Sequence, residues 1–165
     1  MKIALISPKG DLSKNKKLES FWNTSLETHG FRKSLTGFSS SLLIVAALTP
    51  REHDIKFIDE NFDIIDFREH YDLVAITAMT QQAVRAYQIA DIFRKKGVKV
   101  IIGGIHASVL PYEAKQHVDS VVIGEAENVW SEVLGDLKHS RLKFFYKSNA
   151  PRELSKTPLP RYDLV

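Results

Sequence analysis

Two adjacent glycines and a pair of threonines follow short apolar runs of the sequence, at points where a bound molecule could contact the chain. Gly103 and Gly104 end the run 98–102, and residues 77–80, Thr-Ala-Met-Thr, end the run 73–76. Since a glycine pair has no Cβ, a flat group could lie directly against its backbone, and a threonine hydroxyl could donate a hydrogen bond to a ring nitrogen. The alternative is that Gly-Gly forms only a turn and that the threonines only cap a helix. The residues alone leave both interpretations open.

Several common kinds of site lack their sequence motif. No GxGxxG follows the first apolar run and no GxxxxGK[ST] occurs, which argues against a dinucleotide-binding turn and a P-loop. The sequence has no cysteine, so a thiolate zinc site, an iron–sulfur cluster and a cysteine nucleophile are excluded within these residues. A phospho-acceptor domain needs acidic residues after its first and third strands and a lysine after its fifth, where this chain has Ser7, Thr77 and Gly124. We therefore assign no catalytic residue and no metal ligand.

The elements that position these residues follow from the apolar pattern. Short β-branched runs predict five buried parallel strands, at 3–6, 55–58, 73–76, 98–102 and 120–123. Helical patterns lie between them, at 39–48, 81–96, 111–117 and 125–137. This alternation predicts an α/β fold, a doubly wound, mainly parallel five-stranded flavodoxin-like sheet in the order 2-1-3-4-5, with helices on both faces. In such sheets a ligand lies beyond the carboxyl ends of the strands.

Length and composition are ordinary for one soluble domain, with 165 residues, of which 44% are hydrophobic and 26% charged. The net charge of +3 is too small to indicate nucleic acid as a partner. The longest apolar stretch, 42–48, is too short to span a membrane, and the chain starts without a signal peptide. With no cysteine, these features favour a cytoplasmic location. Residues 11–38, a long polar connection that contains Phe21 and Trp22, have no assigned role.

Four segments carry a resemblance to a known family: DLVAITAMT (72–80), RAYQIADIFRKKGVKVIIGGIHAS (85–108), LPYEA (110–114) and DSVVIGEAENVW (119–130). Together they resemble the amino-terminal cobalamin-binding domain of the cobalamin-dependent radical S-adenosylmethionine enzymes. The segments LKFFY (142–146) and PLPRYDL (158–164) are similar to that family's passage into its radical domain. We therefore expect a cobalamin-binding domain at 1–140, followed at 141–165 by an edge strand and a linker toward a further domain.

The resemblance implies that residues near the strand ends bind the cofactor, namely Ser7, Asp11, Thr77, Ala78, Met79, Thr80, Gly103, Gly104, His106, Ser108, Gly124 and Glu125. The related domain of methionine synthase has the pattern D-x-H-x-x-G, and Ser13 stands here where its histidine would be. The resemblance thus implies cobalamin bound without a protein histidine on the lower face of cobalt, with its dimethylbenzimidazole tail near Thr77 and the glycine pair. His106 would face the corrin, as a hydrogen-bonding partner rather than as a cobalt ligand. Replacing Gly104 by valine should then abolish binding and leave the fold intact.

The resemblance also implies partners beyond this chain. In the family, the following domain of the same polypeptide carries a [4Fe-4S] cluster and S-adenosylmethionine, and the outcome is methyl transfer or radical cyclisation. The chain alone should bind cobalamin without turnover. Two alternatives remain open at this point: a scaffold or docking domain that has lost cobalamin, and a flavodoxin-like domain that binds flavin mononucleotide.

Overall fold

The computed structural model describes residues 1–10, 40–149, 153, 155 and 157–165. One parallel sheet forms the centre of the molecule, in the strand order β2-β1-β3-β4-β5-β6. Its strands are β1 (Lys2–Ser7), β2 (Asp54–Asp59), β3 (Leu73–Thr77), β4 (Lys99–Gly103), β5 (Ser120–Ile123) and β6 (Phe145–Lys147). The α/β fold and the order of the five predicted strands are confirmed, and a sixth strand extends the sheet.

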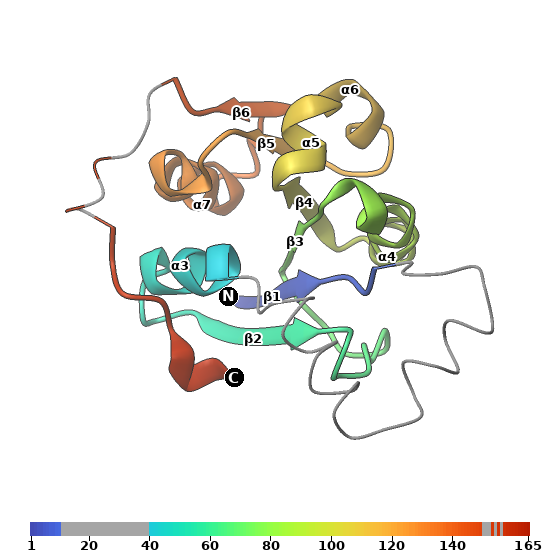
Figure 1. The fold of residues 1–165 in the computed structure, drawn as a ribbon, viewed down its shortest axis with the longest axis horizontal. Coiled ribbons are helices and arrows are strands. Elements are labelled where there is room, and N and C mark those ends of the chain that lie inside the picture. Colours follow the sequence, from blue (N-terminus) through green and yellow to red (C-terminus); the bar gives the residue numbers. More distant parts are fainter. Residues whose placement is uncertain (11–39, 150–152, 154, 156) are drawn as a thin grey trace.

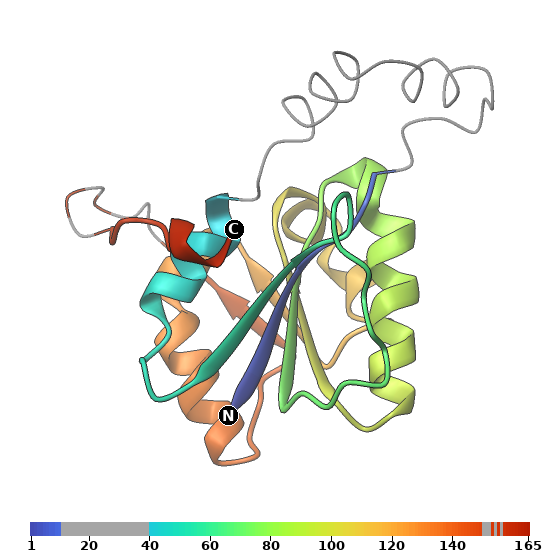
Figure 2. The same ribbon diagram turned by 90° about the horizontal axis from the view of Figure 1, so that it is seen from below.

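Helices cover both faces of the sheet (Figures 1 and 2). The α-helices are α3 (Ser40–Leu48), α4 (Ala83–Lys95), α5 (Ile105–Val109), α6 (Pro111–Ala114) and α7 (Trp130–Lys138), and the 3₁₀ turns are η1 (Thr80–Gln82), η2 (Ala126–Asn128) and η4 (Tyr162–Leu164). Among the described residues, α3 and α7 pack on one face, while α4, α5 and α6 contribute to the core on the other face.

The two core layers follow from the alternation of side chains along each buried strand. In β1, Ala4 and Ile6 face the layer under α4, whereas Ile3 and Leu5 face the layer under α3 and α7. All four side chains are fully buried. Continuous apolar runs, rather than alternating ones, therefore mark the central strands, as expected for a parallel sheet that is covered on both faces.

The short strand β6 is held at the edge of the sheet by a buried carboxylate of α7. Asp136 accepts hydrogen bonds from the Tyr146 hydroxyl at 2.9 Å and from Arg141 Nε at 2.8 Å. The hydrogen bond from Arg141 lowers the pKa of Asp136, and the Tyr146 hydroxyl also accepts the backbone N–H of Lys143. These contacts join α7 to β6 through polar side chains, which an apolar pattern does not reveal. The apolar pattern therefore indicated an edge strand at 142–146 but not the contacts that hold it.

The last residues return to the outside of α3. The backbone N–H of Arg161 donates to the carbonyl oxygen of Leu43 at 3.1 Å, and Leu164 packs against the core layer beneath α3. The division into a domain at 1–140 and a linker at 141–165 stays a prediction. Among the helices that the structure describes, none combines the length and the apolar character that a membrane crossing requires.

Candidate functional site

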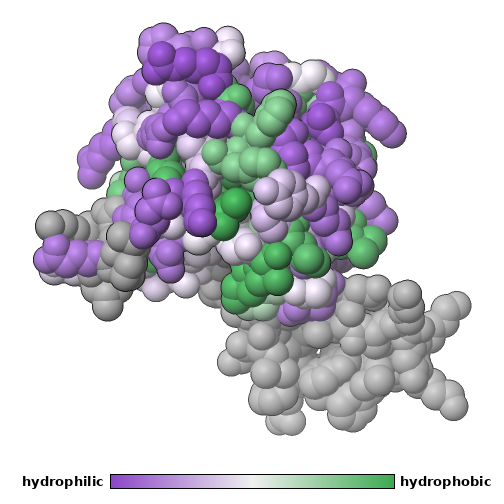
Figure 3. Space-filling view, turned by 90° about the horizontal axis from the view of Figure 1, so that it is seen from above, coloured by the Kyte–Doolittle hydropathy of each residue, from purple (hydrophilic) through white to green (hydrophobic). Residues whose placement is uncertain are grey.

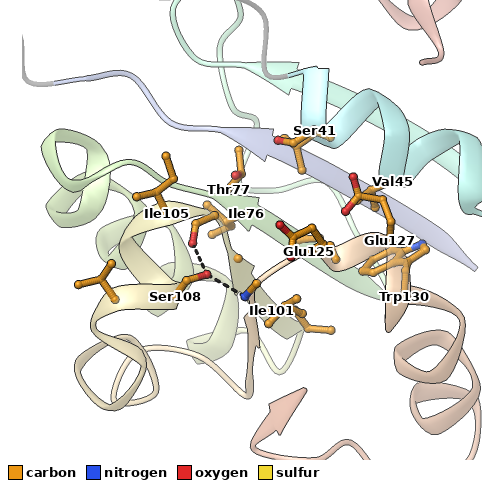
Figure 4. A pocket seen from close by; sticks show the side chains of 18 residues that line it. Ser41, Val45, Ile76, Thr77, Ile101, Ile105, Ser108, Glu125, Glu127 and Trp130 are labelled. Atoms are coloured by element: carbon orange, nitrogen blue, oxygen red, sulfur yellow. Dashed lines mark hydrogen bonds between the residues drawn. The ribbon is translucent and has the colours of Figure 1, made fainter. Parts of the chain in front are cut away.

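A cavity of about 450 Å³ opens at the carboxyl edge of the sheet, between α3, α5 and the start of α7 (Figure 4). Strands β3, β4 and β5 form its floor, and the segment after β5 closes one side. The volume falls within the range of about 300–1,000 Å³ that small-molecule sites typically have. The cavity lies where ligands bind to doubly wound sheets.

The deep part of this cavity is apolar and its rim is polar. The buried lining residues are all hydrophobic: Leu42, Val45, Ala75, Ile76, Ile101, Val122 and Trp130. The polar lining side chains, Ser41, Thr77, Ser108, Glu125 and Glu127, are exposed or only half-buried. A ligand that fits the cavity would therefore place an apolar end inside and a polar end at the mouth.

Small residues create the hollow. Ala75 and Gly103 lie on neighbouring strands and line the cavity where larger side chains would fill it. A Cβ added at Gly103 would make ordinary contact with Val122, whose Cβ would lie 3.6 Å away. The backbone of Gly103 therefore tolerates a side chain, but the cavity would lose the volume that this side chain occupies.

Gly104 has a different role, because it lets two loops approach each other. Its φ is +91°, and a Cβ there would lie 2.7 Å from Thr77 Oγ1 and 2.9 Å from the carbonyl oxygen of Ala78. The loops are joined by backbone hydrogen bonds from Ala78 to Gly103 and from His106 to Ala78. Gly104 is therefore required for the conformation that begins α5.

Ser108 links α5 to the loop that follows β5. Its hydroxyl donates to the carbonyl oxygen of Gly104 at 2.9 Å and accepts the backbone N–H of Gly124 at 3.0 Å (Figure 4). Gly124 has a φ of +81°. Both hydrogen-bonding functions of Ser108 are thus engaged. Among the described residues, Thr77 has no such partner for its hydroxyl, which leaves this group available to a ligand at the rim.

A chain of buried hydrogen bonds fixes the opposite wall. The indole Nε1–H of Trp130 donates to Thr49 Oγ1 at 2.8 Å, and the Thr49 hydroxyl donates to the carbonyl oxygen of Val45 at 2.8 Å. Thr49 is 5% exposed and Trp130 2%. The aromatic wall is therefore held at a fixed distance from α3, and its polar hydrogen points away from any ligand.

The structure places His106 outside the cavity. Its ring is 4% exposed and lies among polar groups of α4, η1 and α6, and His106 does not line the cavity. Nε2 is 2.9 Å from the Tyr87 hydroxyl and 3.2 Å from Glu113 Oε1, and Nδ1 is 3.4 Å from Thr80 Oγ1. The helix α5 turns the His106 side chain toward α4 and away from the cavity, and the contact with the corrin that the resemblance implies stays a prediction.

Tyr87 lies at the centre of this buried polar cluster. Its hydroxyl donates to Glu113 at 3.0 Å, so the same oxygen can accept the Nε2–H of His106. Burial is the main cause that raises the pKa of Tyr87. The ring also stacks on His117, with centroids 4.2 Å apart. The cluster anchors α5 and thereby holds one wall of the cavity.

Replacing Tyr87 by phenylalanine is expected to lower the free energy of unfolding by about 1–2 kcal/mol, because the His106 N–H loses one of its buried acceptors. Urea unfolding followed by circular dichroism measures this loss. The same change at Tyr112, which is 78% exposed, is the matched control and should alter stability by less than about 0.5 kcal/mol. Equal effects of the two substitutions would show that the cluster does not stabilise the fold.

The other residues singled out from the sequence fall into three groups. Thr77, Gly103, Gly104, Ser108, Gly124 and Glu125 line the cavity. Ala78 and Ser7 are buried, Met79 and Thr80 are exposed, and none of these four lines it. Asp11, Ser13, Phe21 and Trp22 lie outside the described residues. Half of the predicted set is thus brought together around one cavity.

Sequence reasoning missed the walls from α3 and α7. Leu42, Val45 and Trp130 follow the apolar pattern of helix residues that pack on a sheet. No feature of the neighbouring sequence therefore distinguishes these cavity residues from core residues. Ile105 and Val109, which line the cavity, are exposed to solvent, and so are Leu110 and Phe144. Figure 3, which views the side formed by α5, α6 and β6, shows apolar surface gathered there.

One family model and three known proteins match this chain. A family model described as B12 binding domain matches residues 35–134. Two methyltransferases of Chlorobaculum tepidum are similar: the bacteriochlorophyllide d C-8(2)-methyltransferase, 45% identical over 74% of this chain, and the C-12(1)-methyltransferase, 41% identical over 76%. An uncharacterized methyltransferase of Pyrococcus horikoshii is 30% identical over 79%. No solved structure matches the chain significantly.

The chain spans only 28%, 28% and 34% of the length of these three relatives. The family model, in contrast, covers more than half of this chain and includes α3 through most of α7. The matched region thus contains every element that forms the cavity. The chain belongs to the B12-binding domain family, which confirms the resemblance to a cobalamin-binding domain.

Proposed function

We propose that this chain binds cobalamin with the nucleotide tail of the cofactor inserted into the cavity at the carboxyl edge of the sheet. The observation that carries the proposal is the hollow over Ala75 and Gly103, bordered by the available hydroxyl of Thr77. Its apolar depth suits a dimethylbenzimidazole base, and its polar rim suits the ribose and phosphate. The residues present therefore fit the cofactor that the family binds.

Binding without a protein histidine on cobalt is the second part of the proposal. Ser13 stands at the position where the methionine synthase pattern has its histidine. Of the histidines in the described part of the chain, none lines the cavity, and His106 is engaged with Tyr87 and Glu113. The base would lie away from cobalt, and no described histidine is placed to replace it.

The third part of the proposal concerns the function of the whole protein. The relatives are named methyltransferases, and the matched region makes up only 28%, 28% and 34% of their length. We expect this chain to act as the cofactor module of a methyltransferase, with a following radical domain that binds an iron–sulfur cluster and S-adenosylmethionine. When bound, cobalamin supplies a cobalt centre that can carry a methyl group. This chain positions the cofactor and, alone, should not turn over.

Adding cobalamin to the purified chain should produce the visible spectrum of bound, base-off cobalamin, because the tail occupies the cavity and no described histidine replaces it. An absorbance titration measures both the spectrum and the affinity. The His106→Gln variant should give the same spectrum, since this residue faces α4. No spectral change would favour the scaffold alternative, a yellow protein as purified would favour flavin, and a spectrum altered by His106→Gln would contradict the proposed arrangement.

A further inference from the structure

The deep wall of the cavity offers a bound molecule almost no hydrogen-bonding group. Its buried lining side chains are hydrocarbon apart from the indole of Trp130, whose N–H is donated to Thr49. Thr49 in turn uses its own hydrogen on Val45. The main-chain groups of the floor belong to the paired strands β3, β4 and β5. The polar groups that remain are at the rim.

We propose that this cavity selects the lower base of the cofactor and favours an apolar benzimidazole over a purine, with Trp130, held by Thr49, and Val122 as selecting residues. The inference rests on the proposed function and deepens it. The ribose and phosphate of the tail are polar and stay at the rim, so the base is the part that reaches the apolar depth. Adenine carries an amino group and additional ring nitrogens there, and each would be buried without a partner.

The size of the preference follows from the number of polar atoms left without partners. One buried donor or acceptor that loses its hydrogen bond to water typically weakens binding by about tenfold or more. The methyl groups of dimethylbenzimidazole, in contrast, gain from burial against Leu42 and Val45. The Thr77 hydroxyl can serve only one nitrogen near the mouth, and that nitrogen is present in both kinds of base.

A series of three ligands tests the preference on the unmodified chain. Cobalamin, the cobamide with adenine as its base, and cobinamide, which has no base, share one corrin and are compared by equilibrium dialysis. We expect the adenine cobamide to bind at least about tenfold more weakly than cobalamin. Equal affinity of the two cobamides, both tighter than cobinamide, would overturn the base selection and leave the proposed function standing. Equal affinity of cobalamin and cobinamide would instead contradict insertion of the tail.

A substitution in the deep wall tests the cause. Val122→Thr keeps the shape of a buried strand residue and adds a hydroxyl, so the preference for cobalamin should fall about threefold or more. The matched control is Val100→Thr, on β4 but in the core layer under α4, and it should leave the ratio unchanged. An unchanged ratio in folded Val122→Thr would overturn the role of the apolar wall.

Discussion

Replacing Gly103 by valine should weaken cobalamin binding by roughly 10- to 100-fold while the domain stays folded. The added side chain would project from the floor of the cavity into the space assigned to the nucleotide tail. Its Cβ would meet Val122 at an ordinary distance of 3.6 Å, and the backbone of Gly103 does not have the positive φ that disfavours side chains. A substitution at Gly103 can therefore weaken cobalamin binding without unfolding the domain. An absorbance titration gives the affinity, and a thermal melt gives the stability.

The matched control for this substitution is Gly135→Val. Gly135 lies in α7, and a Cβ there would meet no atom within 4 Å. The control adds the same side chain to the same domain away from the cavity, so it should bind cobalamin as the unmodified chain does. If Gly103→Val and Gly135→Val bound equally well, the tail would not lie over β4, and the site would have to be placed elsewhere.

The central strands could be predicted because the residue types along each strand indicate that it is buried. Continuous apolar, β-branched runs are typical of strands that are covered on both faces, and the run 73–76 forms β3 (Leu73–Thr77). The edge strand β6 was less well defined, since it is short and depends on the bond between Tyr146 and Asp136. Contacts between distant residues of this kind leave no periodic pattern in the sequence.

The helix α5 explains why His106 does not line the cavity. Five residues are too few to show a helical period, so the segment after the glycine pair resembled a loop at the ligand edge. The helix instead turns the His106 ring toward Tyr87 and Glu113, where three elements supply its partners. A single sequence does not distinguish a buried, hydrogen-bonded histidine from an exposed histidine at a ligand-binding site.

The cavity itself could be predicted only in part. The glycine pair and Thr77 were found because they follow apolar runs at the ligand edge of the sheet, where a missing Cβ and a free hydroxyl suit contact with a bound group. The hollow, however, depends on Ala75 beneath Leu42 and Val45, and on an aromatic wall held by Thr49. An alanine in a buried strand indicates core, and the space above it becomes evident only when the helices are placed.

The substitution Gly104→Val is expected to destabilise the domain by about 2–5 kcal/mol, so its loss of binding would accompany loss of the fold. A positive φ costs a residue with a side chain about 1–2 kcal/mol, and crowding in a packed region adds about 1–3 kcal/mol. Here φ is +91°, and the new Cβ would lie 2.7 Å from Thr77 Oγ1 and 2.9 Å from the carbonyl oxygen of Ala78. This result would correct the sequence-based expectation that the substitution removes only the binding site. Urea unfolding of Gly104→Val and of Gly103→Val measures how much more stability is lost at Gly104 than at the adjacent glycine.

A second variant separates the two causes of this destabilisation. Gly104→Ala combined with Thr77→Ala removes the hydroxyl contact but retains the positive φ and the contacts with the backbone of Ala78. The double variant should therefore recover only part of the stability that Gly104→Ala loses, and a complete recovery would show that the backbone at this position is not strained. If Gly104→Val unfolded at the same urea concentration as the unmodified chain, the close approach of the two loops would not determine the fold here, and Gly104 would then become the cleaner test of ligand contact.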